Sequence, residues 1–296
     1  MSANRLTTLL HGRPAILDGG YGWLLQERGL PAGEAAESWN LHNPEAIEAL
    51  HEEYAQAGAR ILTTNTFGAT EPRLAMHGLD GRSEEVAHAA AAIARRVADR
   101  HDILVAGDVG PTGELLEPLG TLTPEAAQAL FAEQITGLVA GGADLILIET
   151  MSDLEETKAA VAAAQEVAPN LPIIATLSFD TNLRTMMGVD PASAVRTLAE
   201  AGVDAVGANC GRGPDDMRQI AAQLEGASHD GILIVAQSNA GLPELDGESF
   251  VYTVDPAAMA EHALELRDLG VDVIGACCGS SPDHIRAMAA ALHPQA

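Results

Sequence analysis

A segment plan that recurs four times constrains the fold of this chain most strongly. In each copy the end of a helix is followed by glycine, by alanine or valine, and then by a short apolar run. The copies span 54–66, 138–150, 198–210 and 266–278 and read YAQAGARILTTNT, LVAGGADLILIET, LAEAGVDAVGANC and LRDLGVDVIGACC. Because glycine suits the left-handed turn that ends many helices, each copy is interpreted as the junction of a repeated helix–strand unit.

Short apolar runs along the chain are interpreted as eight strands. They are nearly continuous rather than alternating, which is typical of a parallel sheet covered on both faces. The runs lie at 15–20, 60–67, 103–109, 144–150, 172–179, 204–210, 232–239 and 272–278. Segments of helical length separate them, and several open on a capping residue followed by proline. No tight hairpin turn is predicted between any two strands.

Eight such units in 296 residues, 47% of them hydrophobic, predict one (β/α)8 barrel of the TIM type over residues 1–296. A doubly wound open sheet is the alternative. It is weakened because the segment after the first strand, DGGYGW, lacks the G-x-G-x-x-G fingerprint of dinucleotide-binding sheets. No linker, low-complexity tract or charge block divides the chain, so a single domain is expected.

The charge balance argues against two classes of partner. The chain has 42 acidic and 16 basic residues, a net charge of −26. Nucleic acids and anionic membranes both require clustered lysine and arginine, so neither is expected to bind. No apolar run reaches the length of a spanning helix, and the first twenty residues do not resemble a signal peptide. Three cysteines, two of them adjacent, form a poor disulfide framework, so a cytoplasmic location is expected.

Polar residues gather at the carboxyl ends of the proposed strands, where the active site of a barrel lies. They are Asp18, Thr63 to Thr66, Asp108, Glu149, Thr150, Ser178, Asn209, Cys210, Ser238, Asn239, Cys277 and Cys278. Among them, Asp18 and Glu149 are candidates for holding a substrate ammonium group. A carboxylate in this position can instead cap the following helix, and we assign that task to Asp153.

All three cysteines, Cys210, Cys277 and Cys278, lie at such strand ends. One interpretation is that each cysteine is simply a small core residue. Another is that the adjacent pair, Cys277 and Cys278, forms a redox disulfide. Three converging thiolates would instead bind a soft metal, most simply zinc, and leave one tetrahedral position open for a thiol substrate. No C-x-x-C pair supports the metal, so the residues alone leave these interpretations open.

Two aromatic residues, Tyr21 and Trp23, follow the first strand. They could face a sulfonium or quaternary ammonium group through cation–π contact, and packing against the first helix is the alternative. Because aromatic residues make up only 3% of the chain, no complete aromatic cage is predicted. The histidines, which include His51 and His262, do not recur at ligand spacing and are predicted to be solvated.

Motifs along nearly the whole chain carry a resemblance to a known family. They are LDGGYGWLLQERG, WNLHNPEAI, AGARILTTNTFGA, GDVGPTGELLEPLG, ADLILIETMSDLEETKAA, DAVGANCGRGPDDM, SNAGLPEL and DVIGACCGSSPDHI. With them the chain resembles the homocysteine S-methyltransferase family. That family includes betaine– and S-methylmethionine–homocysteine methyltransferases and the homocysteine domain of cobalamin-dependent methionine synthase. The paired NC and CCG segments, in that order, are its most specific signature.

The resemblance implies a metal site and a substrate site at the carboxyl end of the barrel. Cys210, Cys277 and Cys278 would bind zinc, and homocysteine thiolate would take the fourth position. Asp18 and Glu149 would lie near the substrate amino group, with Gly19 beside Asp18 in the substrate site. Asn209 and Asn239 match family positions beside the metal, and Asn239 would approach zinc when substrate is absent.

Three segments depart from the usual family pattern. The common GGCCGTTP reads GACCGSSP, the usual proline before NAG is Ser238, and Tyr21 and Trp23 stand where other residues are frequent. None of these changes removes a metal ligand. The change at Tyr21 and Trp23 bears on the methyl donor.

The activity that follows from the resemblance is methyl transfer to zinc-bound homocysteine thiolate, which yields methionine. A small onium donor of the S-methylmethionine, S-adenosylmethionine or betaine type is favoured. A separate methyl-corrinoid protein is the competing donor, because TNTFGA, GPTGELLEPLG and NAGLPEL look closest to the methionine synthase domain. Two alternatives of another class remain: a barrel lyase or aldolase with inert cysteines, and a non-catalytic thiol- or zinc-binding protein.

Overall fold

Eight parallel strands form a barrel in the computed structural model, which describes residues 6–7, 10, 14–228, 231–246 and 249–294. The strands are β1 (Ala15–Ile16), β2 (Ile61–Thr63), β3 (Leu104–Val109), β4 (Leu145–Met151), β5 (Ile173–Leu177), β6 (Ala205–Cys210), β7 (Leu233–Ser238) and β10 (Val273–Ala276). Their order is β1-β10-β7-β6-β5-β4-β3-β2, and a bridge between Leu17 and Ile61 closes the ring. Each strand falls within a predicted run, except that β4 ends one residue later, at Met151, so the predicted (β/α)8 barrel is confirmed.

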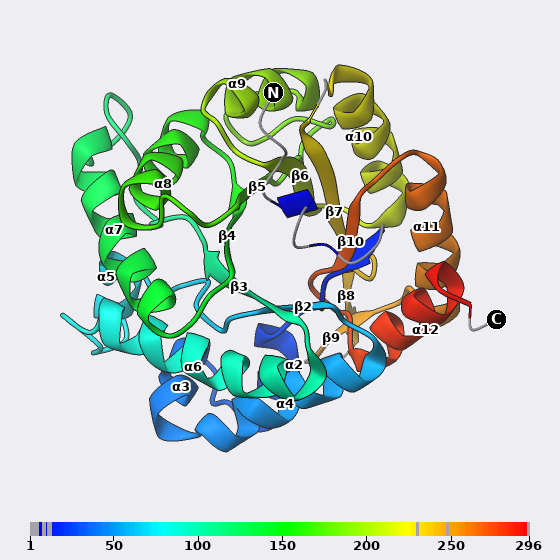
Figure 1. Cartoon of the computed structure of the whole chain (residues 1–296), viewed down its shortest axis with the longest axis horizontal. Helices are drawn as coiled ribbons and strands as arrows, with labels where there is room; N and C mark the ends of the chain where they lie inside the picture. The colour runs from blue at the N-terminus through cyan, green and yellow to red at the C-terminus, as the bar shows by residue number, and fades with distance from the viewer. Residues whose placement is uncertain (1–5, 8–9, 11–13, 229–230, 247–248, 295–296) are drawn as a thin grey trace.

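Helices form an outer ring around the strands (Figure 1). They are α2 (Gly22–Glu27), η1 (Ala36–Ser38), α3 (Trp39–His42), α4 (Pro44–Ala57), α5 (Glu71–Ala75), α6 (Ser83–His101), α7 (Pro124–Ala140), α8 (Leu154–Val167), α9 (Pro191–Glu200), α10 (Pro214–Ala227), α11 (Pro256–Asp268) and α12 (Pro282–Leu292). Asp153 caps α8 as predicted, since its side chain accepts from the Glu155 N–H. Among the described residues, no helix has both the length and the apolar character of a membrane span.

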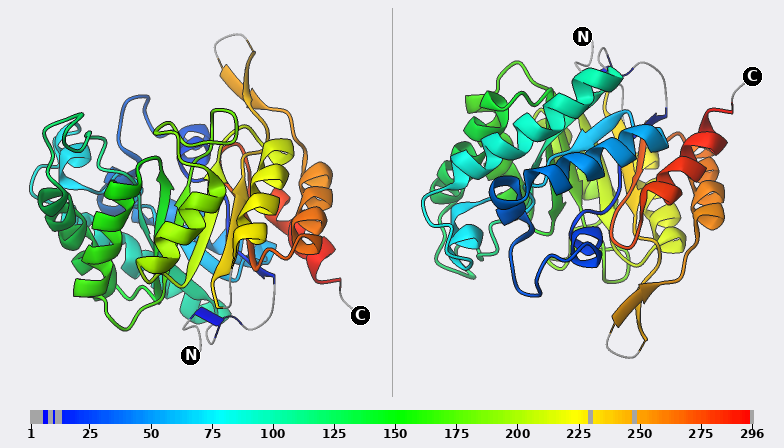
Figure 2. Two further views of the ribbon diagram at one scale, coloured as in Figure 1. Left: turned by 90° about the horizontal axis from the view of Figure 1, so that it is seen from above. Right: turned by 90° about the horizontal axis from the view of Figure 1, so that it is seen from below.

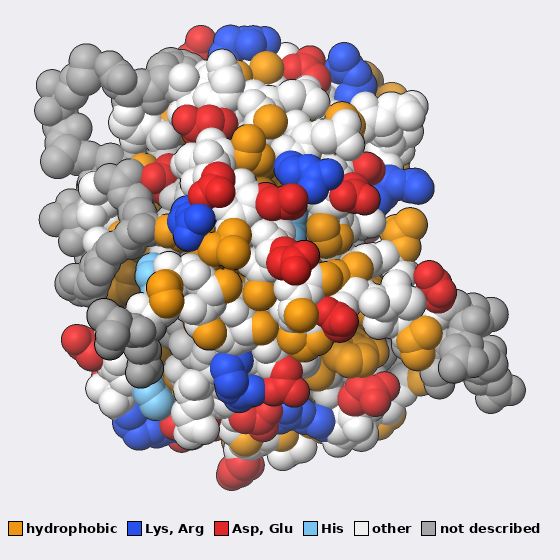
Figure 3. All heavy atoms as spheres, turned by 90° about the vertical axis from the view of Figure 1, so that its right-hand side faces the viewer, with side chains coloured by type: hydrophobic (Ala, Val, Ile, Leu, Met, Phe, Trp, Pro, Cys, Tyr) orange, Lys and Arg blue, Asp and Glu red, His pale blue; other side chains and the backbone are white. Residues whose placement is uncertain are grey.

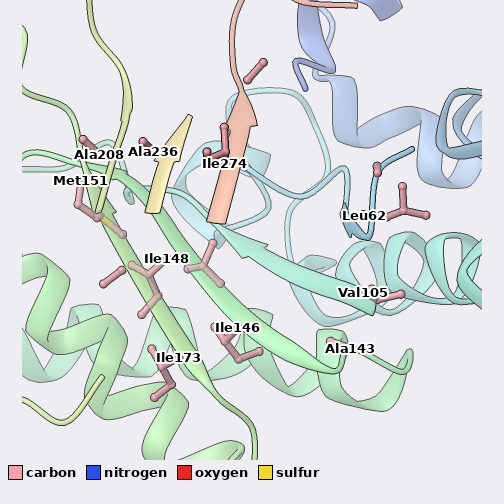
Figure 4. Close-up of a cluster of buried hydrophobic side chains, with 14 of the residues drawn as sticks. Leu62, Val105, Ala143, Ile146, Ile148, Met151, Ile173, Ala208, Ala236 and Ile274 are labelled. Carbon is pink, nitrogen blue, oxygen red and sulfur yellow. The ribbon is translucent and has the colours of Figure 1, made fainter. Parts of the chain in front are cut away.

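Alternate residues of each strand face opposite sides of the barrel wall. Leu145 and Leu147 of β4 belong to the cluster that fills the barrel interior. Ile146 and Ile148 belong to the larger cluster between the strands and the helices, part of which Figure 4 shows. Both faces are therefore buried, which explains why the sequence shows continuous apolar runs without alternation. Polar side chains enter this interior only beyond the apolar layers.

A hairpin corrects one sequence prediction. β8 (Pro243–Asp246) and β9 (Ser249–Tyr252) pair antiparallel and project from the body of the barrel after β7 (Figure 2). The prediction that no two strands are joined by a tight turn is therefore wrong. The two connecting residues, 247–248, lie outside the described residues, but Asp246-Gly247 is a common hairpin-turn pair.

The surface over α11 and α12 mixes acidic and basic side chains (Figure 3). Arg218 of α10 pairs with Glu265 of α11, with 2.9 Å between Nη1 and Oε2. The excess of acidic residues is therefore not gathered into one continuous patch on this face.

Candidate active site

The three cysteines converge at the carboxyl end of the barrel. Cys210 ends β6, Cys277 and Cys278 follow β10, and β7 lies between these two strands. The Cys210 sulfur lies 2.8 Å from that of Cys277 and 3.9 Å from that of Cys278, and all three sulfurs lie within 4.8 Å of one another. All three cysteines are free thiols.

This donor set fits a metal ion. Thiolates bound to zinc at about 2.3 Å lie about 3.8 Å apart in a tetrahedral site. The longer sulfur–sulfur distance matches that spacing, and the shorter one needs to open by about 1 Å. The sulfurs are thus close enough to share one ion. Cys277 and Cys278 are not joined by a disulfide, so the structure does not support the redox-disulfide interpretation.

Special backbone conformations aim the sulfurs at one point. Cys210 adopts a φ of 60°, a left-handed conformation that is uncommon for a residue with a side chain. After Cys278 the chain turns at Gly279, whose φ is 78°. A Cβ atom on Gly279 would lie 2.0 Å from the Tyr252 ring, so only glycine fits there. The Gly20 backbone packs equally closely, since a Cβ there would lie 2.8 Å from the Cys277 carbonyl oxygen.

Two asparagines support the cysteine loops. The Asn239 side chain donates to the Gly211 carbonyl at 2.7 Å and accepts from the Cys278 N–H at 3.0 Å, so it ties the two loops together. The Asn209 amide oxygen accepts from the Thr150 N–H at 2.8 Å, and its nitrogen lies 3.9 Å from the Cys277 sulfur. Both side chains lie beside the sulfurs, and both are held by bonds within the protein.

Replacing Asn239 with alanine is expected to weaken metal binding by about 10- to 100-fold, because loss of a supporting contact frees the ligand loops. Competition with a chromophoric chelator measures this affinity. Asn170→Ala, at an exposed asparagine away from the site, is the matched control and should leave the affinity unchanged. Equal affinities in the two variants would show that Asn239 does not position the ligands.

A cavity of about 260 Å³ opens beside the sulfurs. All three cysteines line it, together with the predicted residues Gly19, Tyr21, Trp23 and Glu149. Its acidic side chains are Glu37, Asp108 and Glu149, and none of the described residues that line it is lysine, arginine or histidine. The cavity is therefore suited to a ligand that carries positive charge.

Glu149 extends into the barrel on the same face of β4 as Leu145 and Leu147. Burial, reinforced by the negative charges expected on Cys278 and Asp18, raises the pKa of Glu149 to about 8. Its nearest hydrogen-bonding group is the Gln237 amide nitrogen at 3.5 Å. The Gln237 amide oxygen is buried and finds no hydrogen-bond partner within the described part of the chain.

Asp18 lies behind the cavity wall and is not among the residues that line it. Its carboxylate accepts from the Tyr21 hydroxyl at 2.6 Å, from the Thr63 N–H at 2.7 Å and from the Thr63 hydroxyl at 2.7 Å. Burial nevertheless raises the pKa of Asp18 to about 7, although these hydrogen bonds lower it. Both of its side-chain partners, Tyr21 and Thr63, line the cavity, so the charge of Asp18 lies beside the cavity.

The two aromatic residues after β1 have distinct surroundings. The Tyr21 hydroxyl lies 2.8 Å from the His51 Nδ1 as well as bonding Asp18, so Tyr21 supports this carboxylate from within the wall. Trp23 packs edge-on against Tyr252 at the base of the hairpin, with 6.0 Å between ring centroids. Each contributes to the cavity wall. Tyr21 also packs against His51 and Tyr54 of α4, whereas Trp23 packs against the hairpin and not against a helix as the alternative interpretation expected.

The prediction that the histidines are solvated is wrong for His51 and His262, which are both buried. The His262 Nε2 lies 2.6 Å from the Ser238 hydroxyl. Burial lowers the pKa of His51 to about 3 and that of His262 to about 4, so both rings are neutral at pH 7. Their hydrogen bonds hold the ends of the strands rather than a ligand.

Sequence reasoning passed over Gln237 and gave Asp108 no role. Gln237 falls two residues after Val235, and Asp108 two residues after Ala106, and both of those apolar residues face the barrel interior. The side-chain period of a strand therefore places Gln237 and Asp108 on the inner face. Counting from the inward apolar residues would have found them.

The fold and the site together define a barrel enzyme suited to a thiolate-bound metal. The family profile described as homocysteine S-methyltransferase matches residues 15–292, and the chain belongs to that family.

Relatives of two kinds are similar to the chain. The methionine synthases of Mycobacterium leprae (strain TN) and Mycobacterium tuberculosis (strain ATCC 25618 / H37Rv) are 31% and 32% identical to it over 303 residues. These matches cover 97% of the chain but 25% of each synthase, so the chain spans about a quarter of their length.

Solved structures of the Escherichia coli homocysteine methyltransferase MmuM share the fold. The oxidised form aligns with a TM-score of 0.79 at 25% identity, and the metallated form with a TM-score of 0.80 at 24% identity. Each alignment covers 97% of this chain and 99% of the MmuM chain.

Proposed function

We propose that this chain transfers a methyl group to the sulfur of homocysteine and thereby forms methionine, with zinc held by Cys210, Cys277 and Cys278. The observation that carries the proposal is the convergence of three free thiols beside a cavity whose charged lining is acidic. Family membership supports the acceptor, and we take residues 1–296 to act as one homocysteine-binding domain.

Zinc is the proposed metal because three cysteine ligands favour it over harder cations. MmuM, which shares the fold, has been solved in a metallated form, which supports a role for a metal. When bound, zinc lowers the pKa of a thiol and so supplies a thiolate at neutral pH.

The chain's own residues orient the amino acid. The substrate ammonium group carries three N–H donors and a positive charge. Glu149 offers a carboxylate, and Gln237 beside it offers a buried amide oxygen that no described residue bonds. Asp18 is hydrogen-bonded to Thr63, which lines the cavity, and its negative charge would add to the attraction for the ammonium group. An ammonium group bound here would compensate the buried carboxylates, whose pKa values are raised mainly by burial.

Methyl transfer is an in-line displacement, so alignment and exclusion of water are the protein's main contributions. Tyr21, Trp23 and Phe67 supply apolar surface to the cavity wall. The volume of about 260 Å³ lies near the lower end for small-molecule sites. We therefore favour a small onium donor, with S-methylmethionine ahead of betaine and of the bulkier S-adenosylmethionine.

A separate methyl-corrinoid protein is the second candidate donor. It is favoured by the similarity to two methionine synthases, of which this chain spans about a quarter. In that case the chain would activate homocysteine and receive the methyl group at the open end of the barrel.

A methyl-transfer assay with homocysteine tests the proposal. The donor panel contains S-methylmethionine, betaine, S-adenosylmethionine and methylcobalamin, and metal content is measured on the same preparation. We expect stoichiometric zinc and methionine formation with at least one donor. Zinc and homocysteine binding without turnover would indicate a non-catalytic binding protein. Turnover that survives complete chelation would exclude the metal-dependent mechanism.

A further inference from the structure

Asp108, at the carboxyl end of β3, is a buried carboxylate for which the proposed function leaves no partner. Its residue is 3% exposed and lines the cavity. The Oδ1 atom has no hydrogen-bond partner among the described residues. The backbone on either side is fixed, because the Asp108 N–H donates to the Thr64 hydroxyl at 2.9 Å and its carbonyl accepts from the Thr66 hydroxyl at 2.7 Å. The backbone that carries the carboxylate is therefore fixed, and none of the described residues that line the cavity brings it a positive charge.

The strand order places Asp108 across the cavity from the sulfurs. β7 lies between the two cysteine-bearing strands, and β3 is four strands away from β7 in either direction around the closed ring of eight. Asp108 and the three cysteines nevertheless line one cavity. A ligand that reaches from the sulfurs to the opposite wall therefore ends at Asp108.

The other acidic residues of the cavity are better satisfied. Glu37 accepts a hydrogen bond from the Gly68 N–H, and Glu149 lies beside the Gln237 amide. Burial, together with repulsion from Glu149, Glu37 and Asp18, raises the pKa of Asp108 well above its usual range. A cation placed at Asp108 would remove this cost.

Homocysteine supplies one ammonium group, which the proposed function assigns to Glu149 and Gln237. We infer that Asp108 binds a second cation, the ammonium group of a small sulfonium amino acid that serves as the methyl donor. This inference rests on the proposed function and specifies its donor. In-line transfer requires the donor sulfonium to lie against the acceptor sulfur, so the group that reaches the opposite wall is the donor's ammonium.

The reaction balances without an oxidant or reductant. A lone pair on the acceptor sulfur forms the new sulfur–carbon bond, and the bond between the methyl carbon and the donor sulfonium breaks. Its electron pair stays on the donor sulfur, which leaves as a neutral thioether. Asp108 takes no part in bond making and selects the donor. The only cation of betaine is the trimethylammonium group that carries the methyl, so betaine has no second ammonium group to place at Asp108.

Two donors that differ in the ammonium group test the assignment. S-methylmethionine carries it, whereas dimethylsulfoniopropionate keeps a dimethylsulfonium and a carboxylate but lacks it. With homocysteine saturating, Asp108→Asn should lower kcat/KM for S-methylmethionine at least about tenfold, the value of a charge-assisted hydrogen bond. The KM for homocysteine should change less than about threefold. Glu114→Gln, which removes an exposed carboxylate near the rim, is the matched control and should change neither value.

Calorimetric binding separates this inference from the proposed function. If no donor supports turnover in the wild type, the proposed function fails, and binding of the two sulfonium compounds still decides the role of Asp108. We expect Asp108→Asn to weaken S-methylmethionine at least about tenfold and to leave dimethylsulfoniopropionate and homocysteine unchanged. Equal loss for all three ligands, or no loss for any, would overturn the assignment. The Asn side chain has the same shape as Asp, and Asp108→Ser provides a second variant for the same comparison.

Discussion

Replacing Cys277 with serine is expected to remove the bound metal and to reduce methyl transfer by at least about a thousandfold, because a serine hydroxyl does not ionise at neutral pH and is a poor zinc ligand. The Cys277 sulfur lies 2.8 Å from that of Cys210. Its N–H bonds the Ser238 carbonyl at 2.8 Å, so the backbone position is kept in the variant. The change therefore removes a ligand and leaves the loop in place.

Metal content and turnover are measured on one preparation of this variant. The matched control is the wild-type protein after chelation, which should lose as much activity as Cys277→Ser and regain it when zinc is restored. The variant should not respond to added zinc at the same concentration. Methyl transfer within about tenfold of the wild type would contradict the role of a cysteine-bound metal in the reaction.

The barrel could be predicted from the sequence because burial on both faces leaves a distinctive signal. Leu145 to Ile148 are all fully buried, two toward the interior and two toward the helices, so the run is continuously apolar. The glycine before each such run marks where a helix ends, and this combination repeats along the chain. The hairpin escaped notice because it lies in a loop outside this repeating plan, and its Asp246-Gly247 pair was the only local signal.

The sequence predicted which strand ends carry the residues of the site, but it did not predict which side chains contact one another there. The sequence places Asp18 and Tyr21 next to each other, but it does not show that the Tyr21 hydroxyl bonds Asp18 and approaches His51, which is 30 residues away. That contact depends on how α4 packs against the first strand. Through this contact Tyr21 supports a buried acid as well as lining the cavity, whereas Asp18 is not among the residues that line it.

Replacing Glu149 with glutamine is expected to lower kcat/KM for homocysteine by about a hundredfold and to stabilise the ligand-free protein at pH 8. The first effect follows from losing the charge that holds the substrate ammonium. The second follows from burial. The pKa of Glu149 is raised from 4.5 to about 8 in the folded protein, so the folded state binds its proton more tightly than the unfolded state does.

The sign of the pH dependence follows from this difference. Because the folded state holds the extra proton, ionising Glu149 costs stability, and that cost grows as the pH rises from about 4.5 to about 8. Glutamine removes the cost. The variant should therefore unfold at a temperature higher by about 2–5 °C at pH 8, which corresponds to about 1–2 kcal/mol, and should match the wild type near pH 5.

The affinity for a cationic ligand should increase with pH, whereas the stability of the ligand-free protein decreases. Glu149 holds an ammonium group only when ionised, so the affinity of the wild type for methionine should rise as the pH increases through 7–8 and level off above it. In Glu149→Gln this rise should be much reduced, leaving the smaller contribution of Asp18. Calorimetry across pH 6–9 measures the affinity, and Glu155→Gln, an exposed glutamate on the following helix, is the control.

The two effects of Glu149→Gln have opposite signs, and that distinguishes a binding role from a structural one. A glutamate that merely supports the fold would lose stability and affinity together when replaced. A carboxylate that is buried in order to bind a cationic ligand destabilises the ligand-free protein and strengthens ligand binding. Neutralising it should therefore raise the stability of the protein and lower its affinity for the ligand. A variant that is less stable at pH 8 and still binds methionine as tightly as the wild type would assign Glu149 to the fold and leave the ammonium group without its proposed partner.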